Sequence, residues 1–285
     1  MWFFLRQFFF VCCVHVTLGV LPWDFEASKT VAATTVDIHG QGDTTIVVGD
    51  PTTNTVRLYN QNIGSNTVKH TLRQTLTGSA SSFAGFGIDV SLGGNDVTGD
   101  LLLVGSNSAS SNKIYSGAVY LYSGKNSKWS TQQMFTVPVN GIGNNRFGTE
   151  WTFFGAAVDL DVDTNSRFVV GCANCSAYNL DRGTIFLYEA RDDTSSHFDQ
   201  TESLEAGSSR LYGLGHTEVA IHGNTIVGIV SRDRDWMEGH SDALVFHRTP
   251  SGRWTEMQQL VGDASVTGVA VFDETILLAS SEMTR

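Results

Sequence analysis

Three aspartates at alternating positions form the most chemically distinctive cluster in the sequence. Asp159, Asp161 and Asp163 lie within the segment Asp159-Leu160-Asp161-Val162-Asp163-Thr164-Asn165. A hard cation such as Ca²⁺ needs several carboxylate and carbonyl oxygens that converge on one point, and alternating acids in a turn can supply them. The segment therefore has two interpretations, a calcium site or an acidic hairpin that is only solvated.

A pair of cysteines forms the second candidate site. Cys172 and Cys175, with two residues between them, lie at the end of an apolar, strand-like run, and the other two cysteines, Cys12 and Cys13, lie in the N-terminal apolar segment. A zinc site would need four ligands, and no second close pair supplies them. A thioredoxin-type redox pair would open a helix. We expect a short-loop disulfide in an oxidising compartment, with inert thiols as the alternative.

The same segment holds the one N-x-S/T sequon of the chain, Asn174-Cys175-Ser176. A glycan at Asn174 would place this segment in a surface loop. The alternative is a sequon that is never modified, because such short patterns arise easily by chance.

No catalytic motif accompanies these residues. The sequence has no nucleophile elbow, no phosphate-binding loop, no His-Glu-x-x-His helix and no dinucleotide fingerprint. The charged insertion at 233–238 contains Trp236, an arrangement typical of partner-binding loops, although a solvated loop with a buried Trp236 explains it equally well. A propeller enzyme with acids gathered at its axis would leave no local motif.

The N-terminus indicates export. One positive charge precedes an apolar run from Phe8 to Leu21, which contains small residues at Thr17 and Gly19 near its end. The run is shorter than the roughly 20 residues that span a membrane. We expect a signal peptide over 1–19 and a linker over 20–30, with an uncleaved signal anchor as the alternative.

Composition limits the remaining function classes. The chain has 285 residues, 41% of them hydrophobic and only 16% charged, with a formal net charge of −11. The low charge content and the 17 Phe, 7 Tyr and 6 Trp indicate a folded chain with a sizeable core. The acidic balance would repel a phosphate backbone, so we expect no nucleic-acid partner. A membrane association requires an uncleaved anchor or one beyond residue 285.

Internal repeats identify the elements that must position these residues. A short apolar strand ending in a small residue recurs, and the markers of its five copies, Val48, Val104, Val170, Val227 and Leu278, are 51 to 66 residues apart. Further aromatic and β-branched runs follow, as strands prefer. Each unit therefore holds four short strands separated by Gly, Asn, Ser and Asp clusters.

Four strands per repeat at this period predict the blades of a β-propeller, an all-β fold of four-stranded antiparallel sheets. Such a sheet cannot bury both faces alone, and stacking the blades around an axis buries them. We expect a partial propeller over 31–285, with repeats at about 31–82, 83–146, 147–210, 211–265 and 266–285. The last repeat stops after its second strand, which predicts either a truncated ring or a five-bladed ring completed by N-terminal strands.

The repeats resemble the FG-GAP repeats of integrin α-subunit propellers. The signature of that family is a Phe-Gly pair, then an apolar strand ending in Val-Gly, then Gly-x-Val-Tyr-Val-Tyr. Two units match it, with Phe86-Gly87 before Val104-Gly105 and Phe154-Gly155 before Val170-Gly171, followed by 117–122 and 183–188. Leu214-Gly215 is a looser copy, and the first unit lacks the pair.

This resemblance implies Ca²⁺ binding in the hairpin after the Phe-Gly strand, at Asp159, Asp161 and Asp163. The segment departs from the family loop, because it is short, lacks the mid-loop glycine and carries Arg167 near the position of the closing acid. The guanidinium of Arg167 could neutralise the same carboxylates without a metal.

The resemblance also implies a binding or adhesion module that is secreted or held at the cell surface. We expect a protein or glycan ligand on the loops of one propeller face and no enzymatic activity. A secreted hydrolase or lyase with carboxylates at the axis is the alternative.

Overall fold

The structure of the protein is a computed structural model. The described residues are 35–39, 44–63, 68–78, 85–95, 99–109, 116–125, 128–138, 152–162, 166–175, 182–191, 197–208, 210–232, 240–261 and 264–281. The signal-peptide and linker predictions, Asp163 and Trp236 lie outside them. No helix occurs in these ranges, and none therefore is long and apolar enough to cross a membrane.

Within the described ranges, eighteen strands form four sheets of four strands and one of two, and neighbours within every sheet are antiparallel. The first blade contains β1 (Thr35–His39), β2 (Thr44–Asp50), β3 (Thr55–Ile63) and β4 (Val68–Thr77). The second contains β5 (Phe86–Asn95), β6 (Gly99–Ser106), β7 (Ala118–Lys125) and β8 (Lys128–Phe135). The third contains β9 (Phe154–Asp161), β10 (Arg167–Cys172), β11 (Thr184–Ala190) and β12 (Phe198–Leu204).

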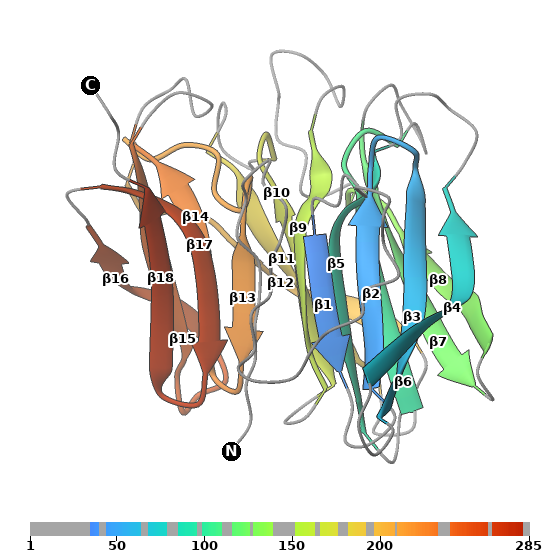
Figure 1. Ribbon diagram of the computed structural model, residues 1–285. Coiled ribbons are helices and arrows are strands. Elements are labelled where there is room, and N and C mark those ends of the chain that lie inside the picture. The colour runs from blue at the N-terminus through green and yellow to red at the C-terminus, as the bar shows by residue number, and fades with distance from the viewer. Residues whose placement is uncertain are drawn as a thin grey trace.

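The fourth blade contains β13 (Val219–His222), β14 (Thr225–Ser231), β15 (Ser241–Arg248) and β16 (Trp254–Leu260). The fifth sheet contains β17 (Ser265–Phe272) and β18 (Thr275–Ser281). This architecture confirms the predicted all-β propeller of four-stranded antiparallel blades. The first strands β1, β5, β9 and β13 lie toward the middle of the molecule, and β4, β8 and β16 lie toward its periphery (Figure 1).

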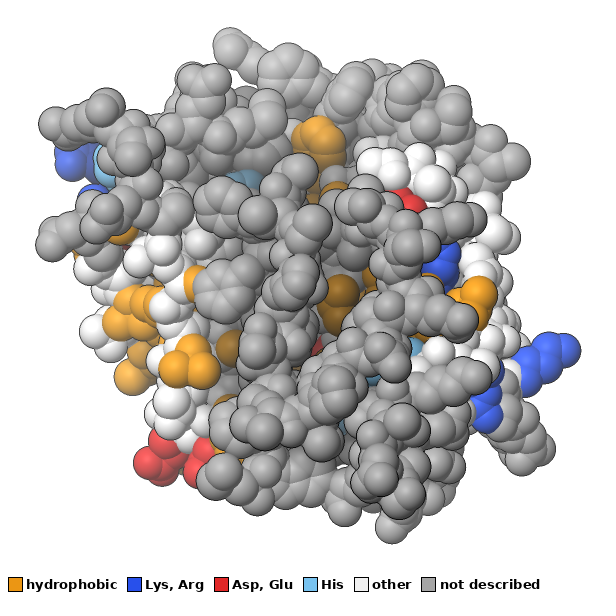
Figure 2. Space-filling view, viewed as in Figure 1, with side chains coloured by type: hydrophobic (Ala, Val, Ile, Leu, Met, Phe, Trp, Pro, Cys, Tyr) orange, Lys and Arg blue, Asp and Glu red, His pale blue; other side chains and the backbone are white. Residues whose placement is uncertain are grey.

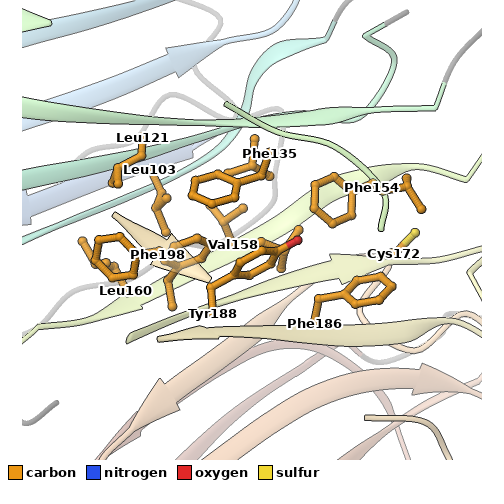
Figure 3. Close-up of a cluster of buried hydrophobic side chains, with 14 of the residues drawn as sticks. Leu103, Leu121, Phe135, Phe154, Val158, Leu160, Cys172, Phe186, Tyr188 and Phe198 are labelled. Carbon is orange, nitrogen blue, oxygen red and sulfur yellow. The ribbon is translucent and has the colours of Figure 1, made fainter. Parts of the chain in front are cut away.

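The core lies between consecutive blades, at interfaces that we call joints. The joint between the second and third blades contains Leu103 and Leu121 on one side and Phe154, Phe168 and Phe186 on the other (Figure 3). All five side chains are fully buried. Leu102 and Val104, which alternate with Leu101 and Leu103 along β6, pack instead in the core shared with the first blade. The middle strands therefore bury both faces, which explains their unbroken apolar runs.

A recurring β-bulge fixes the alignment of the repeats. In each complete blade the register between the third and fourth strands shifts directly after one residue, which is Leu58, Leu121, Leu187 or Val245. The residues that pair with these four on the second strands are Val47, Leu103, Val169 and Val227. The marker Val227 is therefore one residue out of register with Val48, Val104 and Val170, and Gly228 is their true equivalent. Consequently Ile229, and not Gly228, occupies the position that Gly49, Gly105 and Gly171 hold in the first three blades.

The repeated glycines lie where two blades approach most closely. Gly155 has a φ of +81°, and a Cβ there would lie 2.6 Å from the carbonyl oxygen of Ala118 in the preceding blade. A Cβ on Gly105, the penultimate residue of the second strand of that blade, would overlap the carbonyl oxygen of Gly155. In the same way, a Cβ on Gly49 would overlap the carbonyl oxygen of Gly87, and one on Gly171 that of Gly215. Both signature glycines of the repeat are thus required by the close approach of two backbones at the joint.

Candidate functional site

Buried acceptors on the first strands connect each blade to the next. Asp37, Ser91 and Asp159 occupy the same position, directly after the residue that pairs with Val48, Val104 or Val170. The oxygens of these three side chains accept the backbone N–H groups of Leu92 at 2.7 Å, Leu160 at 3.0 Å and Ile221 at 2.7 Å. The inner edge of a first strand has no further strand beside it. The N–H groups on that edge are therefore satisfied by these side chains of the preceding blade.

Asp89 makes a further bond of this kind at the joint between the second and third blades. Its Oδ2 accepts the N–H of Val158 at 2.7 Å, while its Oδ1 accepts the hydroxyl of Thr35 in the first blade at 3.1 Å. The side chain of Asp89 is buried. One carboxylate therefore contacts three successive blades.

The predicted calcium ligand Asp159 lies in this series. Its Oδ2 bonds Ile221 in the next blade, and its Oδ1 accepts the N–H of Leu160 at 2.6 Å and the hydroxyl of Ser91 at 3.2 Å. The side chain is buried. Its oxygens are thus engaged by backbone and hydroxyl donors from three blades.

Asp161, the second predicted ligand, also bonds the fourth blade. Its Oδ2 accepts the N–H of Gly223 at 2.9 Å and lies 3.6 Å from Nη2 of Arg167. Asp159 and Asp161 are therefore both directed at the following blade. Asp163 lies outside the described residues, and no group of three His, Cys, Asp or Glu residues that could hold a metal ion occurs within them.

Arg167 is fully buried at this joint. Its Nη2 donates to the carbonyl oxygen of Gly223 at 2.5 Å, and its guanidinium carbon lies 5.8 Å from the ring centre of Trp254. Glu189 supplies a second carboxylate, 3.8 Å from Nη1. Burial lowers the pKa of Arg167, whereas Asp161 and Glu189 oppose that shift. The cation thus balances carboxylates of its own blade and bonds the next one.

Glutamines on the outermost strands form a second series of contacts between blades. The side-chain amide of Gln74 on β4 donates to the carbonyl of Trp129 and accepts its N–H, both at 2.9 Å. Gln133 on β8 makes the same two bonds to Phe198 at 3.1 Å. Both glutamines pair with the bulge-marking residues Leu58 and Leu121. We call this two-bond contact a glutamine bridge; each one holds the aromatic residue that begins the next outer strand.

The two ends of the blades carry connections of very different length. At one end, the second strand passes to the third and the fourth strand passes to the next blade. The connections there include the long segments 107–117, 136–153, 173–183, 205–218 and 232–240, together with the shorter segments 51–54, 78–85 and 261–264. At the opposite end the strands are joined by shorter hairpins, such as 96–98, 126–127 and 223–224. We call the first of these the long-connection end. Asp159 and Asp161 lie near the hairpin end of β9, so these two predicted calcium ligands and the long connections are at opposite ends.

The predicted disulfide lies at the long-connection end. Cys172 ends β10, and a disulfide joins it to Cys175, with the two Cα atoms 5.3 Å apart. Thr152, which precedes β9, accepts the N–H of Asn174 at 3.1 Å through its carbonyl oxygen and donates its hydroxyl to Ser116 at 2.5 Å. Asn174 itself is half-buried. These bonds fix the ends of three long connections against one another.

The connection 232–240 is also anchored at both ends. Arg232 forms a two-pronged ion pair with Asp242, and its N–H donates to the carbonyl of His240 at 2.9 Å. Asp242 is completely buried and additionally accepts Gln259 at 2.6 Å. A paired, hydrogen-bonded carboxylate of this kind positions its partner precisely. The two ends of the connection that contains Trp236 are therefore held in fixed positions on the blade.

His216 lies at the same end, before β13. Its Nδ1 is 3.0 Å from the carbonyl oxygen of Gly213. Burial lowers the pKa of His216 to about 4, so the imidazole is neutral at pH 7.

The residues of the joints were not predicted as a group from the sequence. Ser91 differs in type from Asp37 and Asp159, and the glutamines Gln74 and Gln133 lie in strands of weak sequence similarity. One signal was available in the sequence. Gln133 and Gln258 lie at the same position in two similar segments, which begin at Trp129 and Trp254.

Comparison with known proteins adds a distant likeness. No protein-family model matches the chain, and no curated protein matches it. Among solved structures, the chain is similar to the crystal structure of a protein from Lactobacillus plantarum, with 12% sequence identity and a TM-score of 0.46. That likeness covers 87% of this chain and 75% of the other.

Proposed function

We propose that this protein is an exported β-propeller module that binds a protein or glycan ligand through the long-connection end of its blades. The observation that carries the proposal is the asymmetry of the connections. Long connections gather at one end, whereas the other end has shorter hairpins. Binding residues of rigid scaffolds are concentrated on such connections.

The bases of these connections are rigid, which supports the proposal. The disulfide of Cys172 and Cys175 and the Arg232–Asp242 pair fix the points at which two of them leave their strands. A ligand-binding loop with a fixed base loses less conformational entropy on binding. Trp236, in the connection 232–240, is the side chain that we expect to contact the ligand.

We further propose that the module is related to the FG-GAP propellers, secreted or held at the cell surface. The Phe-Gly signature supports this relation, because Gly87 and Gly155 both have positive φ and both contact the preceding blade. Export through the N-terminal segment, the disulfide and a glycan at Asn174 belong to the same proposal.

The alternative, a hydrolase or lyase with carboxylates at the axis, is supported less well. The inner-strand carboxylates Asp37, Asp89 and Asp159 each accept a backbone amide of the neighbouring blade. A general acid or base must instead present a free oxygen to its substrate.

The test is a binding screen of the secreted full chain against immobilised glycans and immobilised secreted proteins. We expect Trp236→Ala to remove most binding to any ligand found. Asn224→Ala, in the β13–β14 hairpin at the opposite end, should leave it unchanged. Equal loss in both variants, or loss only in the hairpin variant, would place the ligand elsewhere and contradict the proposal.

A further inference from the structure

The sequon of the chain overlaps its disulfide. Asn174 and Cys175 are the first two residues of Asn174-Cys175-Ser176, and Cys175 is joined to Cys172 by the disulfide. Ser176, which completes the sequon, lies outside the described residues. The residue that would receive a glycan therefore lies inside the short loop that the disulfide closes.

The disulfide holds this loop in a turn. The Cα atoms of Cys172 and Cys175 are 5.3 Å apart. Three residues of extended chain would span about 10 Å. The N–H of Cys175 also donates to the carbonyl oxygen of Cys172, at 3.2 Å, so a hydrogen bond closes the same turn. While the disulfide is intact, the backbone on the N-terminal side of the sequon cannot become extended.

Neighbouring connections hold the backbone on both sides of the Asn174 side chain. The N–H of Asn174 donates to the carbonyl oxygen of Thr152 at 3.1 Å, and the carbonyl oxygen of Cys175 accepts the hydroxyl of Thr184 at 2.9 Å. Both threonines are buried, and Asn174 itself is half-buried. In the folded protein the loop therefore cannot leave the blade without breaking these bonds.

The two cysteines also anchor the loop in the core. Cys172 and Cys175 are 0% and 1% exposed and belong to the core of the joint between the second and third blades. Figure 3 shows Cys172 next to Phe154 and Phe186 of the same core. Elsewhere apolar side chains do lie on the surface, as Figure 2 shows at the left of the view, over β17 and β18. Lifting the loop out would expose apolar surface that this joint keeps covered.

We propose that the Cys172–Cys175 disulfide controls the modification of Asn174. The side chain accepts an N-linked glycan only while the two thiols are reduced, and closure of the disulfide excludes the glycan. An enzyme that attaches so bulky a group must reach the asparagine in an accessible segment. The two cysteines are three positions apart, so they can pair before the blade forms. The inference rests on the proposed export, because only an exported chain meets the glycan donor.

Two reactions compete for this loop. In the first, Nδ2 of Asn174 forms a bond with C1 of an oligosaccharide carried on a lipid pyrophosphate, the C1–oxygen bond to the pyrophosphate breaks, and Nδ2 loses a proton. In the second, the thiols of Cys172 and Cys175 are oxidised to a disulfide, and their two electrons and two protons reduce the disulfide of an oxidoreductase. The product depends on which reaction comes first.

The test measures the glycosylated fraction of the full-length chain made in a eukaryotic secretory cell, by intact mass before and after enzymatic removal of N-linked glycans. Cys172→Ser keeps the sequon and cannot form the disulfide, so it should raise this fraction about threefold or more. A membrane-permeant dithiol during synthesis should raise the fraction in the parent and leave Cys172→Ser unchanged. Ser176→Ala should carry no glycan.

Thr184→Val is the matched control, because it removes the hydroxyl bond to Cys175 and keeps the disulfide. It should leave the glycosylated fraction unchanged, and alkylation without reduction should show that its cysteines remain paired. An equal rise in Thr184→Val and Cys172→Ser would overturn the proposal, because a looser segment alone would then suffice. A parent that is fully glycosylated and has its disulfide closed would also overturn it.

A second comparison does not need export. The full-length chain, oxidised or reduced, is diluted from urea into detergent-solubilised transferase with its lipid-linked donor. We expect the reduced parent and Cys172→Ser to receive a glycan and the oxidised parent to receive none. Equal modification of the oxidised and reduced parent, or of neither, contradicts the proposal. Recovery of the chain from the cytosol with reduced thiols would contradict export alone, so the two proposals fail distinguishably.

Discussion

The third and fourth joints of this propeller are built from the same repeat and yet differ in almost every contact. At the third joint Gly171 lies against Gly215, Asp159 accepts the N–H of Ile221, and Arg167 bonds Gly223. At the fourth joint the position of Gly171 is taken by Ile229 and that of Asp159 by Ala220.

The comparison separates two ways of stacking blades. The third joint combines a close backbone approach with buried polar bonds, which tolerate little variation in distance. The fourth joint is mainly apolar, with Val227, Ile229 and Val245 against Val266 and Val269. One hydrogen bond crosses it, from the N–H of Ser241 to the hydroxyl oxygen of Ser265 at 3.1 Å. Apolar contacts are non-directional, so the last sheet is held mainly by buried area, and within the described residues two strands supply that area.

The largest expected difference is between the core of the second joint, to which Phe168 belongs, and the exposed strand β18. Phe168 is fully buried against Phe135, Tyr188 and Phe198, with ring centres 4.7 to 5.2 Å apart. Phe168→Ala should lower the free energy of unfolding by about 3–5 kcal/mol in chemical denaturation. Leu277→Ala, at an exposed position of β18, should change it by less than about 0.5 kcal/mol. Similar losses in the two variants would contradict the contrast.

The buried acceptor of the third joint should have the next largest effect. Asp159→Asn replaces one carboxylate oxygen by an NH₂ group, which cannot accept an N–H. We expect a loss of about 2 kcal/mol, because a buried donor is left without an acceptor. The control is Asp199→Asn, which disrupts the exposed pair with Arg191 and should leave the melting temperature unchanged. A neutral Asp159→Asn variant would show that the carboxylate does not hold the joint.

The sequence predicted the fold well because its strand signals recur. Four units repeat an apolar second strand and an aromatic third strand, and stacking is the one arrangement that buries both faces of each. The sequence could not predict the joints, because the acceptors at the shared position include Ser91 as well as Asp37 and Asp159, and Ala220 takes that position in the fourth blade. Nor could the sequence show that Asp159 and Asp161 face the next blade. That direction depends on how two blades pack together, and the residues in contact are about 60 positions apart.

Acid should weaken the long-connection end of the fourth blade through His216. Its pKa is about 4 when folded, below the usual value of 6.5, so the unfolded chain binds the proton more tightly. The stabilisation is therefore complete above pH 6.5 and is lost as the pH falls toward 4, by on the order of 2 kcal/mol at pH 4.5. His216→Gln should flatten this part of the stability–pH curve. An unchanged curve would show that His216 is not buried as neutral imidazole.

The smallest expected effect is that of calcium. Because Asp159 and Asp161 already accept amide groups of the fourth blade, free Ca²⁺ should leave the melting temperature unchanged. Arg167→Ala should instead destabilise the protein, since it leaves the buried Asp161 without this cation, whereas Glu189 keeps Arg248 at 3.3 Å. A melting temperature that rises with Ca²⁺, and does so no longer in Asp161→Ala, would favour the metal site.

Native-state hydrogen exchange measured by mass spectrometry tests the central claim most directly, namely that the third joint is held by polar bonds and the last sheet is left open. The account predicts that peptides covering 154–172 and 219–222 exchange only by global unfolding, at a rate that follows the free energy of unfolding. It predicts that 275–281 exchanges much faster, through local opening of β18. Equal protection of 275–281 and 154–172 in the unliganded monomer would contradict it.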